Sequence, residues 1–367
     1  MLADILLLLV VAYSIKIIVF GIAVFKARYP SDLSHTPSVS IIIAARNEAN
    51  NIQQCLNSIT MLSYPTSLLE VVVVDDRSTD GTNAIIQEYA NRFEHIRILT
   101  AVAGQGNLQG KTNAVAQGIE HSTGDILMFT DADCTVPVGW VGETAKYYFD
   151  SSIGVVAGFT SLRAHRWFEA IQALDWFVLF SVAAATIRLK YPVTAVGNNL
   201  SVRRTAYDEV GGYRSIPFSV TEDYALFHAI TRHTNYRAVF PLDPSTLVES
   251  EPCRGFRELY QQKKRWFTGG RGMDVKSLLI FSIPYALNVV ILLNLMFFEF
   301  RFAFAALGIK TCVDLFLAFP SIMTFKRWQL LLCFPVFEAY YIAYVLFFPL
   351  VVLMRKDVVW KERIFGN

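Results

Sequence analysis

Charged residues are scarce in this sequence. Only 17% of its 367 residues are Asp, Glu, Lys or Arg, whereas 53% are hydrophobic, and soluble domains carry about 25% charged residues. The deficit predicts membrane segments. The net charge of +2 is too small to indicate a nucleic-acid partner.

Cysteine is also sparse. The five cysteines have no paired spacing and no metal-ligand pattern, and they stand at Cys55, Cys134, Cys253, Cys312 and Cys333. An odd, scattered set argues against a disulfide framework and suits a reducing compartment.

A complete phosphate-binding P-loop is missing, although "GQGNLQGKT" ends like one. The motif has four residues between its first Gly and Gly-Lys-Thr, but five separate Gly104 from Gly110. The stretch also lies several residues beyond the nearest apolar run, whereas a P-loop joins a strand directly to a helix. The sequence therefore argues against a P-loop ATPase or kinase, and Lys111 needs another explanation.

Three apolar runs are long enough to cross a bilayer, which takes about 20 residues. They are Ile5–Phe25, Leu278–Phe298 and Leu330–Met354. The first run lacks the basic start and the cleavage site of a secretory signal. A fourth run, Phe302–Pro320, is weaker because it contains Lys310 and Asp314. We expect this fourth run to be re-entrant or interfacial, which leaves the C-terminus in the cytoplasm.

The basic residues Lys26 and Arg28 follow the first run, and the positive-inside rule then places the next segment in the cytoplasm. We expect an N-terminal transmembrane helix within residues 1–28 and a cytoplasmic domain over residues 29–275. Two to three spans should follow within residues 276–354, and a basic tail at residues 355–367. In a bacterium, the chain would be an integral protein of the inner membrane.

Several polar residues interrupt the apolar segments. Trp167–Ile187 carries Glu169, Gln172 and Asp175, so we expect a buried or membrane-surface helix rather than a span. A lone charge at the bilayer centre costs roughly 2.5–3.5 kcal/mol. The charged residues of the spans should therefore face one another inside a bundle; these are Lys16, Lys310, Asp314 and Glu338.

Between residues 38 and 133, β-branched runs alternate with helical patterns. Strands are predicted at 38–47, 69–76, 96–100 and 124–133, and helices at 51–62, 78–93 and 111–121. This alternation predicts an α/β fold with a mostly parallel, Rossmann-like sheet and helices on both faces. Ligands bind beyond the carboxyl ends of such strands. The polar residues at those ends are Arg46, Asn47, Glu48, Asp75, Asp76, Asp131 and Asp133.

Asp131 and Asp133 alternate at the end of a predicted buried strand, so their carboxylates should lie close together. Two unpaired carboxylates would repel each other, and a divalent cation removes that repulsion. Hard oxygen ligands suit Mg²⁺ or Mn²⁺, which in turn bind substrate phosphates. The alternative is a solvated turn without a ligand.

Two further motifs precede the second apolar run. Thr221, Glu222 and Asp223 stand ahead of a helical pattern, where acids also suit a helix start without any catalytic role. The stretch "RELYQQKKRWFTGGRG" is dense in basic and aromatic residues. By itself it indicates an interfacial helix at the membrane surface.

Taken in order, these motifs resemble the membrane-bound members of glycosyltransferase family two, such as cellulose, chitin and hyaluronan synthases and ceramide glucosyltransferases. The matching residues are Asp76, Asp131 with Asp133, Asp223 in "TED", and Gln262, Arg265 and Trp266 in "QKKRW". The resemblance covers Ser38 to about Gly270. It implies a GT-A-type domain flanked by transmembrane helices.

The resemblance also assigns the donor side of the expected site. "GKTNA" is similar to a family stretch whose lysine, here Lys111, lies near the nucleotide-sugar. "AARNEA" resembles the first-strand loop that holds the nucleoside, with Ala44, Arg46 and Glu48. "GNNLSVRR", with Asn199, resembles a donor-side loop, and Asp76 would hold the base or ribose.

The implied reaction is an inverting transfer from a nucleotide-sugar, UDP by family default. A metal on Asp131 and Asp133, with Arg265, would stabilise the leaving diphosphate, and Asp223 would act as general base. Gln262 and Trp266 complete the catalytic set, with Trp266 at the acceptor mouth. The small number of spans favours a membrane-lipid acceptor. The alternatives are a processive polysaccharide synthase and, more remotely, a non-catalytic membrane scaffold.

Overall fold

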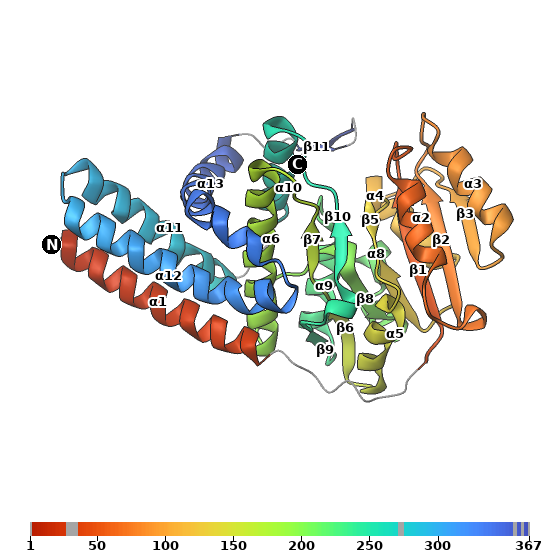
Figure 1. Cartoon of the computed structure of the whole chain (residues 1–367). Coiled ribbons are helices and arrows are strands. Elements are labelled where there is room, and N and C mark those ends of the chain that lie inside the picture. Colours follow the sequence, from red (N-terminus) through yellow and green to blue (C-terminus); the bar gives the residue numbers. More distant parts are fainter. Residues whose placement is uncertain (1, 27–35, 271–274, 355–357, 361–362, 366–367) are drawn as a thin grey trace.

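The computed structural model describes residues 2–26, 36–270, 275–354, 358–360 and 363–365. A part built on a β-sheet lies beside a bundle of long helices (Figure 1). The predicted alternation of strands and helices is confirmed.

The main sheet contains seven strands among the described residues, in the order β3-β2-β1-β4-β8-β6-β9. The first four are parallel to one another, and β8 runs antiparallel to both of its neighbours. The bounds are β1 Val39–Ala45, β2 Leu69–Asp75, β3 Ile96–Thr100, β4 Ile126–Phe129, β6 Ile153–Ala157, β8 Leu200–Arg203 and β9 Arg237–Val239. The carboxyl ends of β2, β1 and β4 therefore meet at one edge.

Successive residues of the central strands pack on opposite faces of this sheet. Ile41 and Ile43 of β1 belong to a buried cluster that includes α2 (Ile52–Thr60) and α3 (Thr82–Arg92). Ile42 belongs to a second cluster with α4 (Gly110–Glu120). Because side chains alternate along a strand, a sheet covered on both faces needs uninterrupted apolar strands such as "VVVV" in β2.

Shorter elements complete the sheet part. The helices are α5 Trp140–Ala145, α7 Arg204–Glu209, α8 Gly212–Ser215 and α9 Glu222–His233. A small second sheet joins β5 (Cys134–Thr135), β10 (Val248–Ser250) and β7 (Thr160–Leu162). Because β5 begins directly after Asp133, this small sheet fixes the chain that leaves the two acids.

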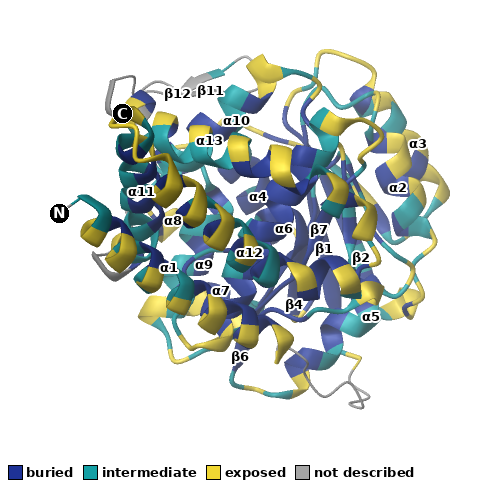
Figure 2. Cartoon of the chain, turned by 60° about the vertical axis from the view of Figure 1, so that its left-hand side comes forward, coloured by how far each residue is buried: buried dark blue, intermediate teal, exposed yellow. Residues whose placement is uncertain are grey.

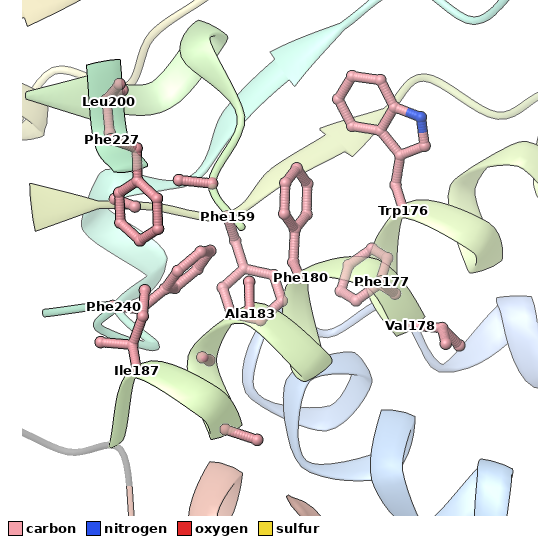
Figure 3. Close-up of a cluster of buried hydrophobic side chains, with 14 of the residues drawn as sticks. Phe159, Trp176, Phe177, Val178, Phe180, Ala183, Ile187, Leu200, Phe227 and Phe240 are labelled. Carbon is pink, nitrogen blue, oxygen red and sulfur yellow. The ribbon is translucent and has the colours of Figure 1, made fainter. Parts of the chain in front are cut away.

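Helix α6 (Trp167–Arg188) lies between the sheet part and the long helices, as the sequence predicted for a buried helix. It is buried over most of its length (Figure 2). Phe177 and Phe180 pack with Phe159 and Phe240 of the sheet part (Figure 3), and the rings of Phe159 and Phe240 are 5.1 Å apart. On its other side, α6 contacts α1 and α12.

The bundle consists of α1 (Leu2–Phe25), α11 (Val275–Met296) and α12 (Phe300–Thr324), which run side by side away from the sheet (Figure 1). Within the described residues, five helices are long and apolar enough to cross a membrane, and these three are among them with α6 and α13. The re-entrant form expected for Phe302–Pro320 is not found, since α12 is one continuous helix of 25 residues, and the interfacial form stays a prediction.

Helix α13 (Phe334–Met354) takes a different direction from the bundle (Figure 1). It follows a short 3-10 helix, Trp328–Cys333, that packs against α6. Its last turns pack against α10 (Phe256–Gly269), where the ring of Phe348 lies 5.7 Å from Tyr260. Both ends of α13 therefore lie beside elements that contact the sheet part. A hairpin of β11 (Val358–Trp360) and β12 (Arg363–Phe365) follows, with β11 beside α10.

The charged residues of the long helices find partners inside the protein. Lys310 donates to Asp314 at 2.6 Å and to Glu338 of α13 at 2.5 Å, and the Tyr13 hydroxyl donates to Asp314. The expected pairing is confirmed for these three charges. Lys16 instead donates to the backbone carbonyl of Ile280, at 2.9 Å. Lys310 and Asp314, the two charges that made this apolar run look weak, neutralise each other inside the protein, so α12 needs no break.

Candidate functional site

The sequence motifs converge on one cavity of 740 Å³ beyond the carboxyl ends of β1, β2 and β4. Its lining includes eleven of the twelve predicted site residues: Ala44, Arg46, Glu48, Asp76, Lys111, Asp131, Asp133, Asp223, Gln262, Arg265 and Trp266. Residues from 44 to 266 thus meet at one place. The roles assigned to them stay predictions at this point.

Asn199 is the exception, because it does not line the cavity. Its side chain is buried, accepts from the indole N–H of Trp140 at 2.9 Å, and donates to the carbonyls of Phe159 and Thr246. Both N–H groups of the amide donate and its oxygen accepts, so the side chain holds three segments together. The neighbouring Asn198 lines the cavity instead, and a local motif does not distinguish two adjacent asparagines.

One end of the cavity is formed by the loops after β1 and β2. Asp76 is 2% exposed, and its backbone carbonyl accepts from Arg46 at 2.7 Å. Asn47 (φ 52°) and Arg77 (φ 59°) both have left-handed backbones, which cost free energy for residues other than Gly and are found often at ligand sites. The carboxylate of Asp76 accepts a bidentate pair of bonds from Arg363 of the C-terminal hairpin, at 2.6 and 3.1 Å.

Lys111 connects two of the motifs. Its ammonium group lies 2.6 Å from Asp131 and 2.9 Å from Glu222. Although burial lowers the pKa of Lys111, the carboxylates of Asp131, Glu222 and Asp223 raise it well above its usual value, so the group stays charged. This lysine, which belongs to the P-loop-like stretch, is a counter-ion for the acids of the cavity.

The acids after β4 form a candidate metal site. Ligand atoms of Asp131, Asp133 and Cys134 lie within 4.8 Å of one another. Burial and the two aspartates raise the pKa of the Cys134 thiol well above its usual value, which leaves the two carboxylates as the anionic donors. Hard oxygen donors fit Mg²⁺ or Mn²⁺, so the residues present suit the predicted metal.

Asp223 stands at the start of α9 and is held by the backbone. The Gly197 N–H donates to its Oδ2 at 2.6 Å. A Cβ on Gly197 would lie 2.7 Å from the Cβ of Asp223, so only glycine permits this approach. Burial, and next the charge of Glu222, raise the pKa of Asp223 to about 6. A carboxylate with this pKa is ionised at neutral pH and is a better proton acceptor than an ordinary aspartate.

Helix α10 presents Gln262, Arg265 and Trp266 to the cavity. The indole of Trp266 packs against Trp176 of α6 at 5.8 Å between ring centroids, and the Lys263 ammonium lies 4.1 Å from its ring. Lys263 is buried and forms an ion pair with Asp175 of α6. The orientation of Trp266 is therefore set by contacts on two sides. The local sequence pattern around Asp175 indicates a buried or membrane-surface helix and does not predict this ion pair.

Beyond Trp266, the cavity extends between α6, α11 and α13. The residues of this apolar groove include Val178, Leu179, Val182, Leu278, Phe281, Pro284, Tyr285, Tyr344, Val345 and Pro349. The spacing of the motifs does not predict the groove, because it is made by three helices that are distant in sequence. Polar catalytic candidates and an apolar wall thus belong to one continuous space.

The chain is similar to known glycosyltransferases. Residues 40–225 match the family model described as glycosyl transferase family 2. The chain is 30% identical over 241 residues to glycosyltransferase AglE of Haloferax volcanii, covering 65% of this chain and 74% of AglE. It is 28% identical over 243 residues to a beta-monoglucosyldiacylglycerol synthase of Synechocystis, covering 64% of this chain but only 48% of that enzyme.

The fold is also found in a solved structure. Mannosyltransferase PcManGT of Pyrobaculum calidifontis, in complex with GDP-Man and Mn²⁺, superposes with a TM-score of 0.60, at 20% identity, over 93% of this chain and 98% of that one. At this identity the likeness establishes the fold, which is of the predicted GT-A type with long apolar helices. The matched family model spans about half of the chain and contains every motif up to Asp223. The chain therefore belongs to glycosyl transferase family 2 and is a glycosyltransferase.

Proposed function

We propose that this enzyme transfers a sugar, with inversion, from a nucleotide-sugar to the hydroxyl group of a membrane lipid. The observation that carries the proposal is the continuity of the cavity: Asp131, Asp133 and Asp223 share it with an apolar groove between α6, α11 and α13. An acyl or prenyl chain fits an apolar groove, because it passes from the apolar bilayer into the groove without leaving a buried polar group unpaired. The lipid's hydroxyl would then lie near Asp223.

Each part of the cavity has a task in this proposal. Asp76 and Arg46 hold the nucleoside of the donor, UDP by preference, and Asp131 and Asp133 hold the divalent metal. The metal supplies positive charge to the diphosphate, and Arg265 adds to it. Asp223 accepts the proton of the acceptor hydroxyl, and Trp266 presents a flat face to the acceptor sugar or headgroup. The Mn²⁺ bound in PcManGT and the lipid product in the name of the Synechocystis enzyme are consistent with these roles.

The reaction is tested directly by its product. Purified protein in lipid nanodiscs is incubated with a panel of nucleotide-sugars and a membrane lipid extract, and the products are identified by mass spectrometry. A lipid that carries one added sugar is the expected result. A polymer of sugars would instead establish the alternative, a polysaccharide synthase, for which a poly-beta-1,6-N-acetyl-D-glucosamine synthase of Staphylococcus epidermidis, 23% identical, is the precedent.

A tryptophan at Val345, on the groove side of α13, is expected to lower transfer to lipid at least about tenfold, equivalent to about 1.4 kcal/mol. The indole would fill the space of the acceptor chain, so nucleotide affinity should not change. Ala343→Trp, two residues away on an exposed part of the same helix, is the matched control. Unchanged transfer by Val345→Trp, measured as glycolipid formed per minute, would contradict the proposed acceptor site.

We also propose a membrane arrangement. Helices α1, α11 and α12 cross the membrane, whereas α13 lies within the interface, since both of its ends lie beside elements that contact the sheet part. The basic residues after α1 support a cytoplasmic sheet part. Three crossings put the start of α1 outside and the end of α13 inside.

A protease added to sealed, right-side-out vesicles is therefore expected to remove a tag fused before Met1 and to spare a tag fused after Asn367. Opening the vesicles with detergent should expose both tags and serves as the control. A C-terminal tag cleaved in intact vesicles would show that α13 crosses the membrane. The measurement is an immunoblot of the two tags over time.

A further inference from the structure

The C-terminal hairpin reaches the donor end of the cavity from more than 280 positions away. Arg363 donates from both terminal guanidinium nitrogens to the two carboxylate oxygens of Asp76, at 2.6 and 3.1 Å. The Asp76 side chain is 3% exposed and that of Arg363 is 22% exposed. The hairpin also lies beside α10 through β11.

Arg363 occupies both carboxylate oxygens of Asp76, which in the proposed function bind the nucleoside of the nucleotide-sugar. A guanidinium fork matches a carboxylate in one plane and engages both oxygens. Asp76 has almost no other exposed surface, so a nucleoside N–H or hydroxyl group reaches it only after Arg363 has moved. A nucleoside and Arg363 are therefore mutually exclusive partners of Asp76.

A second observation at the same corner points to a ligand. The Nε of Arg46, which lines the cavity, is buried and has no hydrogen-bond partner in the described structure. A buried hydrogen-bond donor without a partner calls for an explanation, and a group that binds there is one. A purely structural Arg363–Asp76 pair would leave the Arg46 Nε without a partner. A nucleotide-sugar bound at this corner could accept its hydrogen bond.

We propose that Arg363 closes the donor site in the absence of nucleotide and that the incoming nucleoside replaces it on Asp76. This proposal rests on the proposed function, in which Asp76 receives the nucleoside. The closed form reduces apparent affinity, because a ligand that binds only the open form has its dissociation constant divided by the fraction of open molecules. The hairpin follows α13, which lines the acceptor groove, so the same segment adjoins both substrates.

The test is nucleotide binding to the full-length protein in nanodiscs with Mg²⁺, measured by isothermal titration calorimetry with UDP and, separately, GDP as probes. Arg363→Ala is expected to tighten the binding of the preferred nucleotide by about tenfold, as for a site that is mostly closed in wild type. The matched control is Arg237→Ala. Arg237 belongs to edge strand β9 and forms an exposed ion pair with Asp150. Removing the Arg237 side chain should leave the dissociation constant unchanged.

A double-mutant cycle identifies Asp76 as the contested group. Asp76→Asn should weaken nucleotide binding. The double variant Asp76→Asn with Arg363→Ala should bind no more tightly than Asp76→Asn alone. Equal or weaker binding by Arg363→Ala alone would overturn the proposal and leave the proposed function standing. Failure of wild type and variants alike to bind either nucleotide would overturn both. Melting temperatures of all variants show whether each protein is folded.

Discussion

Replacing Asp223 with asparagine is expected to lower sugar transfer by roughly 10²–10⁴-fold, the usual contribution of a positioned general base, with little change in nucleotide affinity. Asparagine keeps the shape of the side chain and can accept the Gly197 N–H, but it cannot take a proton. The carboxylate faces the shared cavity, where the acceptor hydroxyl is proposed to lie. The measurement pairs single-turnover transfer rates with nucleotide titrations.

The pH dependence provides an independent check. Transfer needs ionised Asp223, so the rate should fall as the pH drops through about 6, and the same limb should be missing from the residual rate of Asp223→Asn. The stability effect has the opposite sign from that of a salt-bridged aspartate. Because the folded-state pKa is raised above the usual value of about 4, ionisation of Asp223 weakens folding as the pH rises from about 4 to about 6.

Asp223→Asn should therefore melt at the same temperature as wild type or higher at pH 7, which separates loss of the base from loss of the fold. Asp208→Asn, an exposed aspartate on α7, is the matched control and should transfer at the wild-type rate. If Asp223 were only a helix-start residue, the asparagine variant would keep its turnover within a small factor, since asparagine is tolerated there.

Removing divalent metal is expected to abolish transfer, and Mg²⁺ or Mn²⁺ should restore it. Asp131 and Asp133 place carboxylate oxygens close together at the cavity, and Lys111 already neutralises part of their charge. A nucleoside diphosphate brings two or more further negative charges, and Arg265 offers one positive charge to it. We expect a divalent cation to supply the remaining positive charge. Activity is measured in EDTA and after titration with each metal.

The variant Asp133→Asn distinguishes the metal from the base. It weakens the metal site, so nucleotide affinity and transfer should decline together, whereas Asp223→Asn affects transfer alone. Excess Mn²⁺ should partly rescue Asp133→Asn and should not rescue Asp223→Asn. Full turnover of the wild type in excess EDTA would refute the metal assignment.

Local patterns predicted β1 to β4 of the seven-stranded sheet, and β1, β2 and β4 are apolar runs that end in polar residues. Strands β6, β8 and β9 were not predicted. Those polar ends also predicted most of the cavity, since parallel strands bring their carboxyl ends to one edge. The same reasoning missed features that depend on distant segments. Asn198 rather than Asn199 lines the cavity, because the Asn199 side chain is bonded to Trp140, Phe159 and Thr246 instead. The direction of α13 and the reach of Arg363 follow from helix packing, which leaves no local signature.

The groove between α6, α11 and α13 has a kinetic consequence. If acceptors enter it from the bilayer, the enzyme encounters them by diffusion in two dimensions, and the quantity that governs encounter is the mole fraction of acceptor in the membrane. Bulk concentration matters only for the nucleotide-sugar, which arrives from water. The two substrates thus reach one reaction centre from two phases, and the glycosylated product is released into the phase from which its lipid came.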